Sequence, residues 1–230
     1  MILVRGLRKV YGKTVALDGV DLEVQPGELV GLLGHNGAGK STLMKLLAGQ
    51  LMPTAGSVSI AGIDVGADPS AARAQLGYVP EEPALWDYLS AREFLEFVVG
   101  VRGRGDIEAA LAVAGLGADA DRLIREYSQG MRRKTALAAA LVARPPAIVL
   151  DEALNGLDPP SALRVRDHLR VLRDEGAAIL LSTHVLETVE RLADRVVLVA
   201  QGRVVENVAV GALGPGGLEA LFRDRITKVP

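Results

Sequence analysis

GHNGAGKST, residues Gly34–Thr42, matches the pattern G-x-x-x-x-G-K-[ST] at every fixed position. An apolar run, residues 28–33, precedes this stretch, and helix-forming residues 41–50 follow it. A buried strand, a glycine-rich turn and a helix in this order form a loop that holds phosphate groups. The order is also typical of α/β proteins with a parallel sheet, so we expect an α/β fold with a nucleotide phosphate at this loop.

Each residue type in the loop has a physical role. Gly37 and Gly39 allow the backbone N–H groups to curl around phosphate oxygens, and the Lys40 side chain reaches the β- and γ-phosphates. The Ser41 hydroxyl is a ligand for Mg²⁺, and Thr42 can bond a further phosphate. The predicted ATP-binding set in this loop is Gly34, Asn36, Gly37, Ala38, Gly39, Lys40, Ser41 and Thr42.

The remaining sequence alternates between strand and helix patterns, with one interruption. Residues 2–33 are strand-rich, residues 57–65 are typical of a short β pair, and residues 75–80 form an apolar strand ended by proline. From about residue 85 to residue 142 the pattern is helical, after which strands and helices alternate again to about residue 201. This alternation predicts a parallel sheet with crossover helices, interrupted by a helical insertion. Residues 217–230 are too few for a further domain and read as an amphipathic helix.

Composition excludes several classes of protein. The chain has 230 residues, 49% of them hydrophobic, which is enough for a large core, and its net charge of −2 argues against a general nucleic-acid binder. It has no cysteine, which excludes disulfides and cysteine-ligated metal sites. It has neither the apolar run of a signal peptide nor the roughly 18 apolar residues needed to span a bilayer. We therefore expect a soluble, cytosolic protein that is not itself a membrane channel.

Two carboxylates end the apolar strand at residues 147–150. In a parallel sheet, ligands bind at the carboxyl ends of the strands, which is where Asp151 and Glu152 lie. Beside a phosphate loop, we expect Asp151 to hold Mg²⁺ and Glu152 to polarise an attacking water. The alternative is a pair of solvated loop acids.

Three more side chains are expected at the same edge of the sheet. His184 follows an apolar strand and either donates a hydrogen bond to the γ-phosphate or caps the next helix. Glu81 and Glu82 follow the strand at residues 75–80. Apart from these three, Tyr11 lies in an early strand, where it either stacks on adenine or only packs against its neighbours.

The stretch YSQGMRRK, Tyr127–Lys134, opens a second candidate phosphate site. Ser128 is a good N-cap for the helix that follows, yet Gly130 weakens its first turn and three cations stand there. Cations favour the other end of a helix, so this end is expected to hold an anion. One chain thus has two sites that can hold a phosphate: the phosphate loop and the start of this helix. The two sites could bind the same γ-phosphate either within one chain or across two chains.

Taken together, these motifs resemble the ATP-binding subunit of ABC transporters over essentially the whole chain. The matching stretches, in order, are GHNGAGKST (Walker A), YSQGM (signature), AIVLDE (Walker B), NGLD (D-loop, residues 155–158) and STH (switch histidine). The resemblance implies a phosphate-loop (RecA-like) parallel-sheet core, an N-terminal antiparallel β subdomain and an inserted helical subdomain. It also implies one domain over residues 1–230, with the core at 1–84 and 143–230 and the helical signature subdomain at 85–142.

The resemblance further implies partners. Two subunits, identical or homologous, pack head to tail, so that Ser128, Gly130 and Asp158 of one act on the ATP held by Lys40 of the other. ATP closes this dimer, hydrolysis through Glu152, His184 and Lys40 reopens it, and the motion passes to membrane-spanning subunits. These partners would hold the chain, in the cytoplasm, at the inner face of the cell membrane. The cofactors implied are ATP and Mg²⁺.

Two departures from the family pattern bear on this reading. The usual signature Leu-Ser-Gly-Gly-Gln is Tyr-Ser-Gln-Gly-Met here, which retains Ser128 and Gly130. The glutamine-loop position holds Glu81, which can ligand Mg²⁺ through oxygen but adds negative charge near the phosphates. YVPEEP together with YSQGM resembles the exporter-type branch, whose ATPase is a separate chain.

Three other functions remain open from the sequence. The first is a soluble ABC-type ATPase of DNA repair or translation, although the coiled-coil insertion or the second ATPase unit of those proteins is absent. The second is a phosphate-loop kinase, against which Glu152 favours water as the acceptor. The third is a non-catalytic, nucleotide-gated adaptor weakened by Glu81.

Overall fold

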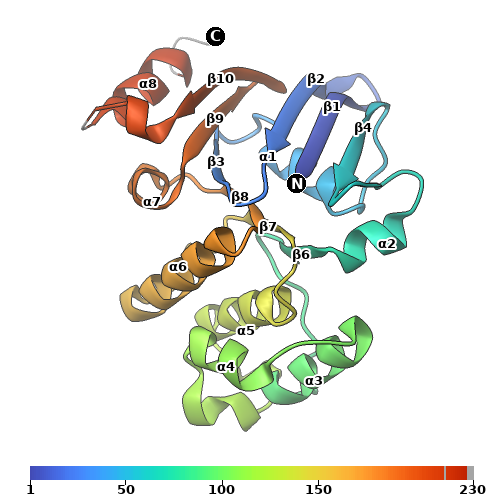
Figure 1. Ribbon diagram of the computed structural model, residues 1–230, viewed down its shortest axis with the longest axis vertical. Coiled ribbons are helices and arrows are strands. Elements are labelled where there is room, and N and C mark those ends of the chain that lie inside the picture. Colours follow the sequence, from blue (N-terminus) through green and yellow to red (C-terminus); the bar gives the residue numbers. More distant parts are fainter. Residues whose placement is uncertain (215, 227–230) are drawn as a thin grey trace.

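The computed structural model describes residues 1–214 and 216–226, and their strands form two sheets (Figure 1). In chain order the strands are β1 (Ile2–Tyr11), β2 (Thr14–Val24), β3 (Leu29–Leu33), β4 (Ala55–Ile60), β5 (Ile63–Asp64), β6 (Leu76–Val79), β7 (Ala147–Asp151), β8 (Ala178–Ser182), β9 (Arg195–Ala200) and β10 (Arg203–Ala209). The helices are α1 (Lys40–Leu47), α2 (Pro69–Ala74), α3 (Ala91–Arg102), α4 (Ile107–Ala114), α5 (Gln129–Leu141), α6 (Pro159–Asp174), α7 (Leu186–Leu192) and α8 (Gly217–Ile226). Short 3₁₀ turns lie at Gly117–Asp121, Ile124–Glu126 and Val210–Ala212.

The larger sheet carries the phosphate loop. Its strand order is β10-β9-β3-β8-β7-β6, and all neighbouring strands are parallel except β10, which runs antiparallel to β9. Every residue of β3, β7 and β8 is buried, because both faces of this sheet are covered: one by α1 and the smaller sheet, and the other by α5, α6 and α7. The predicted α/β fold with a parallel-sheet core is confirmed.

The smaller sheet is antiparallel, with the order β2-β1-β4-β5. It lies beside α1 in Figure 1, and the buried faces of its strands share one apolar cluster with that helix. The pairing of β4 with β5 confirms the short β pair predicted at residues 57–65. This sheet is the N-terminal antiparallel β part that the resemblance implied.

Helices α3, α4 and α5 form a separate layer at the end of the molecule away from the antiparallel sheet (Figure 1). The chain leaves the large sheet after β6 and returns to it at β7, the neighbouring strand. Within this layer an apolar cluster of its own extends from Ala91 to Ala143. The cluster begins six residues after the predicted lower limit, 85, and ends one residue beyond the upper limit, 142. The subdomain division stays a prediction.

Two elements had no counterpart among the predicted ones. β10 is an edge strand whose residues alternate between half-buried and exposed, so it lacks the apolar run of the central strands. α2 is six residues long, too short for a helical period to be seen. The predicted amphipathic helix at residues 217–230 corresponds to α8 up to residue 226, and residues 227–230 lie outside the described part. Over that part, no helix is both long and apolar enough to cross a bilayer.

Candidate nucleotide-binding site

The glycines of the phosphate loop let the backbone turn and pack tightly between β3 and α1. Gly37 and Gly39 have φ values of 82° and 106°, which L side chains rarely adopt. A Cβ on Gly39 would lie 2.6 Å from the carbonyl oxygen of Ala16, and one on Gly34 would lie 2.4 Å from that of Val199. The loop therefore has a fixed backbone shape. The Ala38 N–H donates to the carbonyl oxygen of His35 at 3.1 Å, and the other N–H groups of the loop are placed to face an anion.

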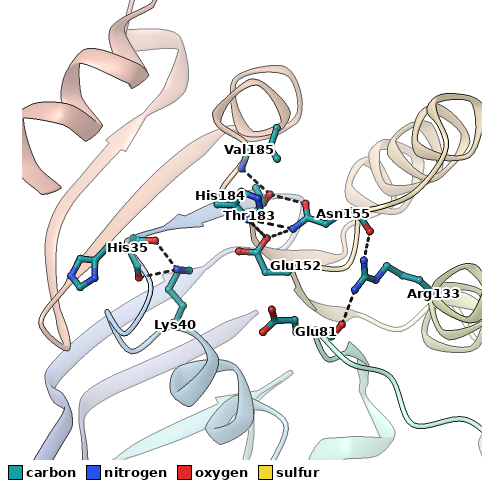
Figure 2. A network of polar contacts seen from close by, with 10 residues as sticks. His35, Lys40, Glu81, Arg133, Glu152, Asn155, Thr183, His184 and Val185 are labelled. Carbon is teal, nitrogen blue, oxygen red and sulfur yellow. Dashed lines mark hydrogen bonds and ion pairs between the residues drawn. The ribbon is translucent and has the colours of Figure 1, made fainter. Parts of the chain in front are cut away.

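Lys40, the first residue of α1, reaches back over this loop (Figure 2). Its Nζ donates to the carbonyl oxygens of Gly34 at 2.6 Å and His35 at 3.2 Å, and the residue is 8% exposed. Burial lowers the pKa of Lys40, and the negative charges of Glu152, Asp151 and Glu81 oppose this shift. A buried ammonium group among carboxylates at the start of a helix is suited to bind a phosphate.

A cavity of about 420 Å³ lies over the loop. Its walls come from the loop, from the first residues of β2 and from two acids beyond the strand ends, namely Thr14, Val15, Ala16, Asn36–Thr42, Glu81 and Glu152. The sequence analysis did not predict Thr14–Ala16 as part of the site, because their position after a tight hairpin is their one distinguishing feature. Tyr11 does not line this cavity, although it pairs across the hairpin with Thr14, and its stacking on adenine stays a prediction.

Asp151 ends β7 beneath the cavity and is 2% exposed. Burial raises the pKa of Asp151, and the nearby Ser41 and Ser182 hydroxyls oppose that shift. Oδ1 of Asp151 and Oγ of Ser182 are buried without a hydrogen-bond partner in the described chain. An orphaned carboxylate oxygen near a serine hydroxyl fits Mg²⁺, which takes one or two protein oxygens and completes its shell with phosphates and water. The described residues contain no cluster of three or more His, Cys, Asp or Glu side chains of the kind that holds a metal alone.

Glu152 and His184 meet beside the cavity (Figure 2). The Oε2 atom of Glu152 accepts from the His184 backbone N–H at 3.3 Å, lies 3.1 Å from His184 Nδ1, and accepts from Asn155 Nδ2 at 2.5 Å. Glu152 has a φ of 50°, a strained conformation for a residue with a side chain. The three contacts hold Oε2 in place and leave Oε1, the other carboxylate oxygen, free for a further partner.

His184 is not the cap of the helix that follows. The N-cap position of α7 is Val185, without a side-chain cap bond, and the His184 side chain is 69% exposed. Because Nδ1 faces Glu152, Nε2 is the ring nitrogen left to face a phosphate. Asn155, which also contacts His184 Nδ1 at 3.4 Å, was quoted in the D-loop motif but given no role from the sequence.

The start of α5 differs from expectation. Ser128 caps the helix as predicted, with its Oγ accepting from Met131 N at 3.3 Å. The three cations, however, do not face an open anion site. Arg132 pairs with Asp87 at 2.7 Å, Lys134 pairs with Asp158 at 2.5 Å, and Arg133 donates to two backbone carbonyls.

Ser128, Gly130 and Asp158 do not line the cavity of their own chain. Asp158 caps α6 through Ser161 N at 2.9 Å, and the Lys134 ammonium, followed by Ser161, holds the pKa of Asp158 well below its usual range. The within-chain alternative, in which both sites bind one phosphate, is therefore not favoured by this geometry. The role of these three residues toward a second chain stays a prediction.

Comparisons with known proteins agree with this site. The family model described as "ABC transporter" (ABC_tran) matches residues 17–155. The bacitracin transport ATP-binding protein BcrA of Enterococcus faecalis is 34% identical over 93% of this chain and 70% of its own length. The lantibiotic transport ATP-binding protein SrtF of Streptococcus pyogenes is 33% identical over 98% of this chain and 97% of its own length.

The chain spans about two thirds of some other relatives. It covers 65% of the daunorubicin/doxorubicin resistance ATP-binding protein DrrA of Streptomyces peucetius, at 38% identity over 90% of this chain. Among solved structures, an ATP-binding subunit of an ABC transporter matches with a TM-score of 0.88 and 31% identity, over 98% of this chain and 94% of that one. The dimeric ATP-binding cassette MJ0796, in a post-hydrolysis state bound to ADP and Pi, matches with a TM-score of 0.84 and 25% identity, over 91% of this chain and 99% of that one.

Proposed function

This chain belongs to the ABC transporter family, and from that premise we propose that it binds and hydrolyses ATP to power transport through separate membrane-spanning subunits. The observation that carries the proposal is the single cavity edge where Lys40, Glu81 and Glu152 meet over the phosphate loop. The phosphate loop alone would bind a nucleotide. The oriented carboxylate beside it can also direct a water molecule at the phosphate, which is what hydrolysis requires.

The proposed reaction is in-line attack of water on the γ-phosphate of ATP. The free carboxylate oxygen of Glu152 accepts a hydrogen bond from the attacking water and orients it. The Lys40 ammonium and Nε2 of His184 stabilise the negative charge that develops on the phosphoryl oxygens. The tight backbone of Gly37–Gly39 fixes the phosphates in line with that water.

We propose Ser41, Asp151 and Glu81 as the residues that hold Mg²⁺, directly or through water. When bound, the ion would neutralise negative charge on the phosphates and so favour attack by water. Asp151 supplies the buried acceptor and Ser41 the hydroxyl next to it. Glu81 approaches from the cavity wall, and its carboxylate replaces the amide that the family usually has there.

The second phosphate site is proposed to act across a head-to-tail dimer of this chain with itself or with a homologue. Ser128 and Gly130 at the start of α5, with Asp158 at the start of α6, would close on the ATP held by the other chain's Lys40. Their absence from the cavity of their own chain supports this arrangement. So does the similarity to MJ0796, whose structures are dimeric.

Export is the proposed direction of transport. Relatives are named for daunorubicin resistance and for bacitracin and lantibiotic transport. These names support the export of antibiotics or similar compounds from the cell. The chain would then work in the cytoplasm, held at the inner face of the membrane by its membrane-spanning partners. Substrate contacts would lie in those partners.

The decisive experiment compares ATP hydrolysis by the wild-type chain with two variants. We expect Lys40→Ala to lose nucleotide binding, whereas Glu152→Gln keeps binding but loses turnover by about a hundredfold or more. Wild-type hydrolysis no faster than that of Glu152→Gln would support the non-catalytic adaptor instead. Phosphate transfer to a small acceptor in place of phosphate release would support the kinase.

A further inference from the structure

Arg133, the fifth residue of α5, joins two loops that approach the nucleotide cavity from different strands (Figure 2). Its Nη2 donates to the carbonyl oxygen of Glu81 at 3.0 Å, and its Nη1 donates to the carbonyl oxygen of Asn155. Its Nε is buried without a partner among the described residues, so the guanidinium is held by these two bonds alone. A Cβ on Gly156 would lie 3.3 Å from Nη1, and the glycine there leaves room for the side chain.

Asn155 passes this contact on to the catalytic acid. Its backbone carbonyl takes the Arg133 bond, while its side-chain Nδ2 donates to Glu152 Oε2 at 2.5 Å. The Asn155 Oδ1 atom lies 3.5 Å from the Thr183 hydroxyl, next to His184. One residue therefore contacts Arg133 on one side and both Glu152 and His184 on the other.

We propose that Arg133 is a positioning residue for ATP hydrolysis. By bonding to both Asn155 and the Glu81 loop, it fixes the position of Asn155 and so aligns Glu152. The inference rests on the proposed function, because it assigns no role unless Glu152 orients water. In the described contacts Arg133 touches neither the phosphate loop nor Lys40, and it bonds to the backbone of Glu81 rather than to its carboxylate. Its effect is therefore expected on turnover rather than on nucleotide binding. It lies five residues after Ser128, and displacement of the start of α5 would reach Glu152 through this chain of contacts.

The chemistry requires an arginine. Its planar guanidinium presents two N–H donors to two carbonyl oxygens at once, whereas lysine is a point charge on a flexible stem. The cations on either side are directed elsewhere. Arg132 pairs with Asp87 and donates to the carbonyl oxygen of Ile124, and Lys134 pairs with Asp158.

The test measures kcat and KM for ATP in Arg133→Met, with Arg132→Met as the matched control on the same helical turn. We expect Arg133→Met to lower kcat about ten- to a hundredfold, with KM within about twofold of wild type, because misplacing Glu152 affects only the reaction step. Arg132→Met should retain the wild-type kcat. Arg133→Lys keeps the positive charge but cannot donate to both carbonyl oxygens at once, so it should not restore kcat.

A double-mutant cycle with Asn155→Ala decides whether Arg133 acts through Asn155. If it does, Arg133→Met adds nothing to the loss already caused by Asn155→Ala, whereas independent effects multiply. Multiplying effects, an unchanged kcat in Arg133→Met, or an equal loss in Arg132→Met would overturn the proposal. Thermal unfolding of each variant separates these outcomes from loss of the fold.

Hydrogen exchange of the segment 152–157 provides a readout that does not depend on turnover. We expect faster exchange in Arg133→Met and wild-type exchange in Arg132→Met, since of these two arginines only Arg133 bonds to this segment. If the wild-type chain hydrolyses no ATP, the proposed function fails by itself, and this exchange comparison still decides whether Arg133 holds Asn155. Equal exchange in both variants would overturn the link.

Discussion

At the scale of single residues, Asp151 lowers the stability of the fold that it serves. Burial raises its pKa in the folded protein above 3.8, so the folded state binds the proton more tightly than the unfolded chain. Stability is then highest while the carboxyl is protonated in both states, and it falls as pH rises through that raised pKa. At neutral pH the charged, half-satisfied carboxylate is a cost that a bound cation would relieve.

Asp151→Asn is therefore expected to raise the unfolding temperature of the nucleotide-free protein at pH 7, by about 2–4 °C for each kcal/mol relieved. The same variant should lose the further stabilisation that Mg-ATP gives to the wild type. Thermal scans with and without Mg-ATP measure both effects. A lower unfolding temperature in the absence of ligand would mean that the carboxylate is better satisfied than its orphaned oxygen indicates.

Glu81 adds a negative charge to the wall of a site that binds phosphates. Glu81→Gln removes that charge, and a unit charge a few Å from a phosphate in water contributes about 1 kcal/mol, or about fivefold in affinity. We expect the variant to bind ATP without Mg²⁺ more tightly by about this factor, and to hydrolyse Mg-ATP as fast as the wild type or faster. Titration in chelator and a steady-state ATPase assay test the two parts. A large fall in turnover would give the carboxylate a role of its own.

At the scale of elements, the phosphate loop was readable from the sequence because its pattern specifies a backbone shape. The start of α5 was not. Its three cations indicated an anion site because the sequence gives no sign of Asp87, Asp158 or the carbonyl of Asn155 as partners. Those partners come from other loops, and only the tertiary fold places them there.

Two glycines of the phosphate loop allow a matched comparison. Gly37→Ala meets no atom within 4 Å and suffers only backbone strain, of about 1–3 kcal/mol. Gly39→Ala adds a contact of 2.6 Å with the carbonyl oxygen of Ala16, which cannot move without disturbing β2. We expect a larger fall in unfolding temperature for Gly39→Ala than for Gly37→Ala. Equal falls would show that β2 yields to the new methyl group.

At the scale of the whole molecule, the alternation of strands and helices predicted the parallel core but not its strand order. Adjacency in the chain says nothing of why β3 lies between β8 and β9, or why β6 is at the edge. The positions of the functional motifs were easier to predict than the strand order, because the carboxyl ends of all strands in a parallel sheet lie at the same edge, whatever the order. The network of Asn155 and Arg133 escaped prediction for the opposite reason, since it joins loops whose approach depends on that topology.

Gly130 is expected to matter only in the dimer. It has no positive φ, and a Cβ there would make ordinary contacts of 3.5 Å with the Gly156 carbonyl and 3.9 Å with Ser128 Oγ. Gly130→Ala should therefore preserve or raise monomer stability, by up to about 1 kcal/mol from helix propensity, while weakening ATP-driven dimerisation. Light scattering of Glu152→Gln with Mg-ATP, with and without Gly130→Ala, measures this. An unchanged dimer would remove Gly130 from the proposed interface.

The place of β3 in the large sheet also governs how the protein is made. This strand carries the phosphate loop, yet its hydrogen-bond partners are distant in the chain: Leu29 pairs with Ile179, and Val30 with Arg195. During synthesis on the ribosome, both edges of β3 stay unpaired until β8 has emerged, and one edge stays unpaired until β9 has emerged; such long-range pairings form slowly. A nascent chain halted before β9 exposes an unpaired edge of an apolar strand, which favours aggregation, and the ability to hold a nucleotide is acquired only after β9 has been made.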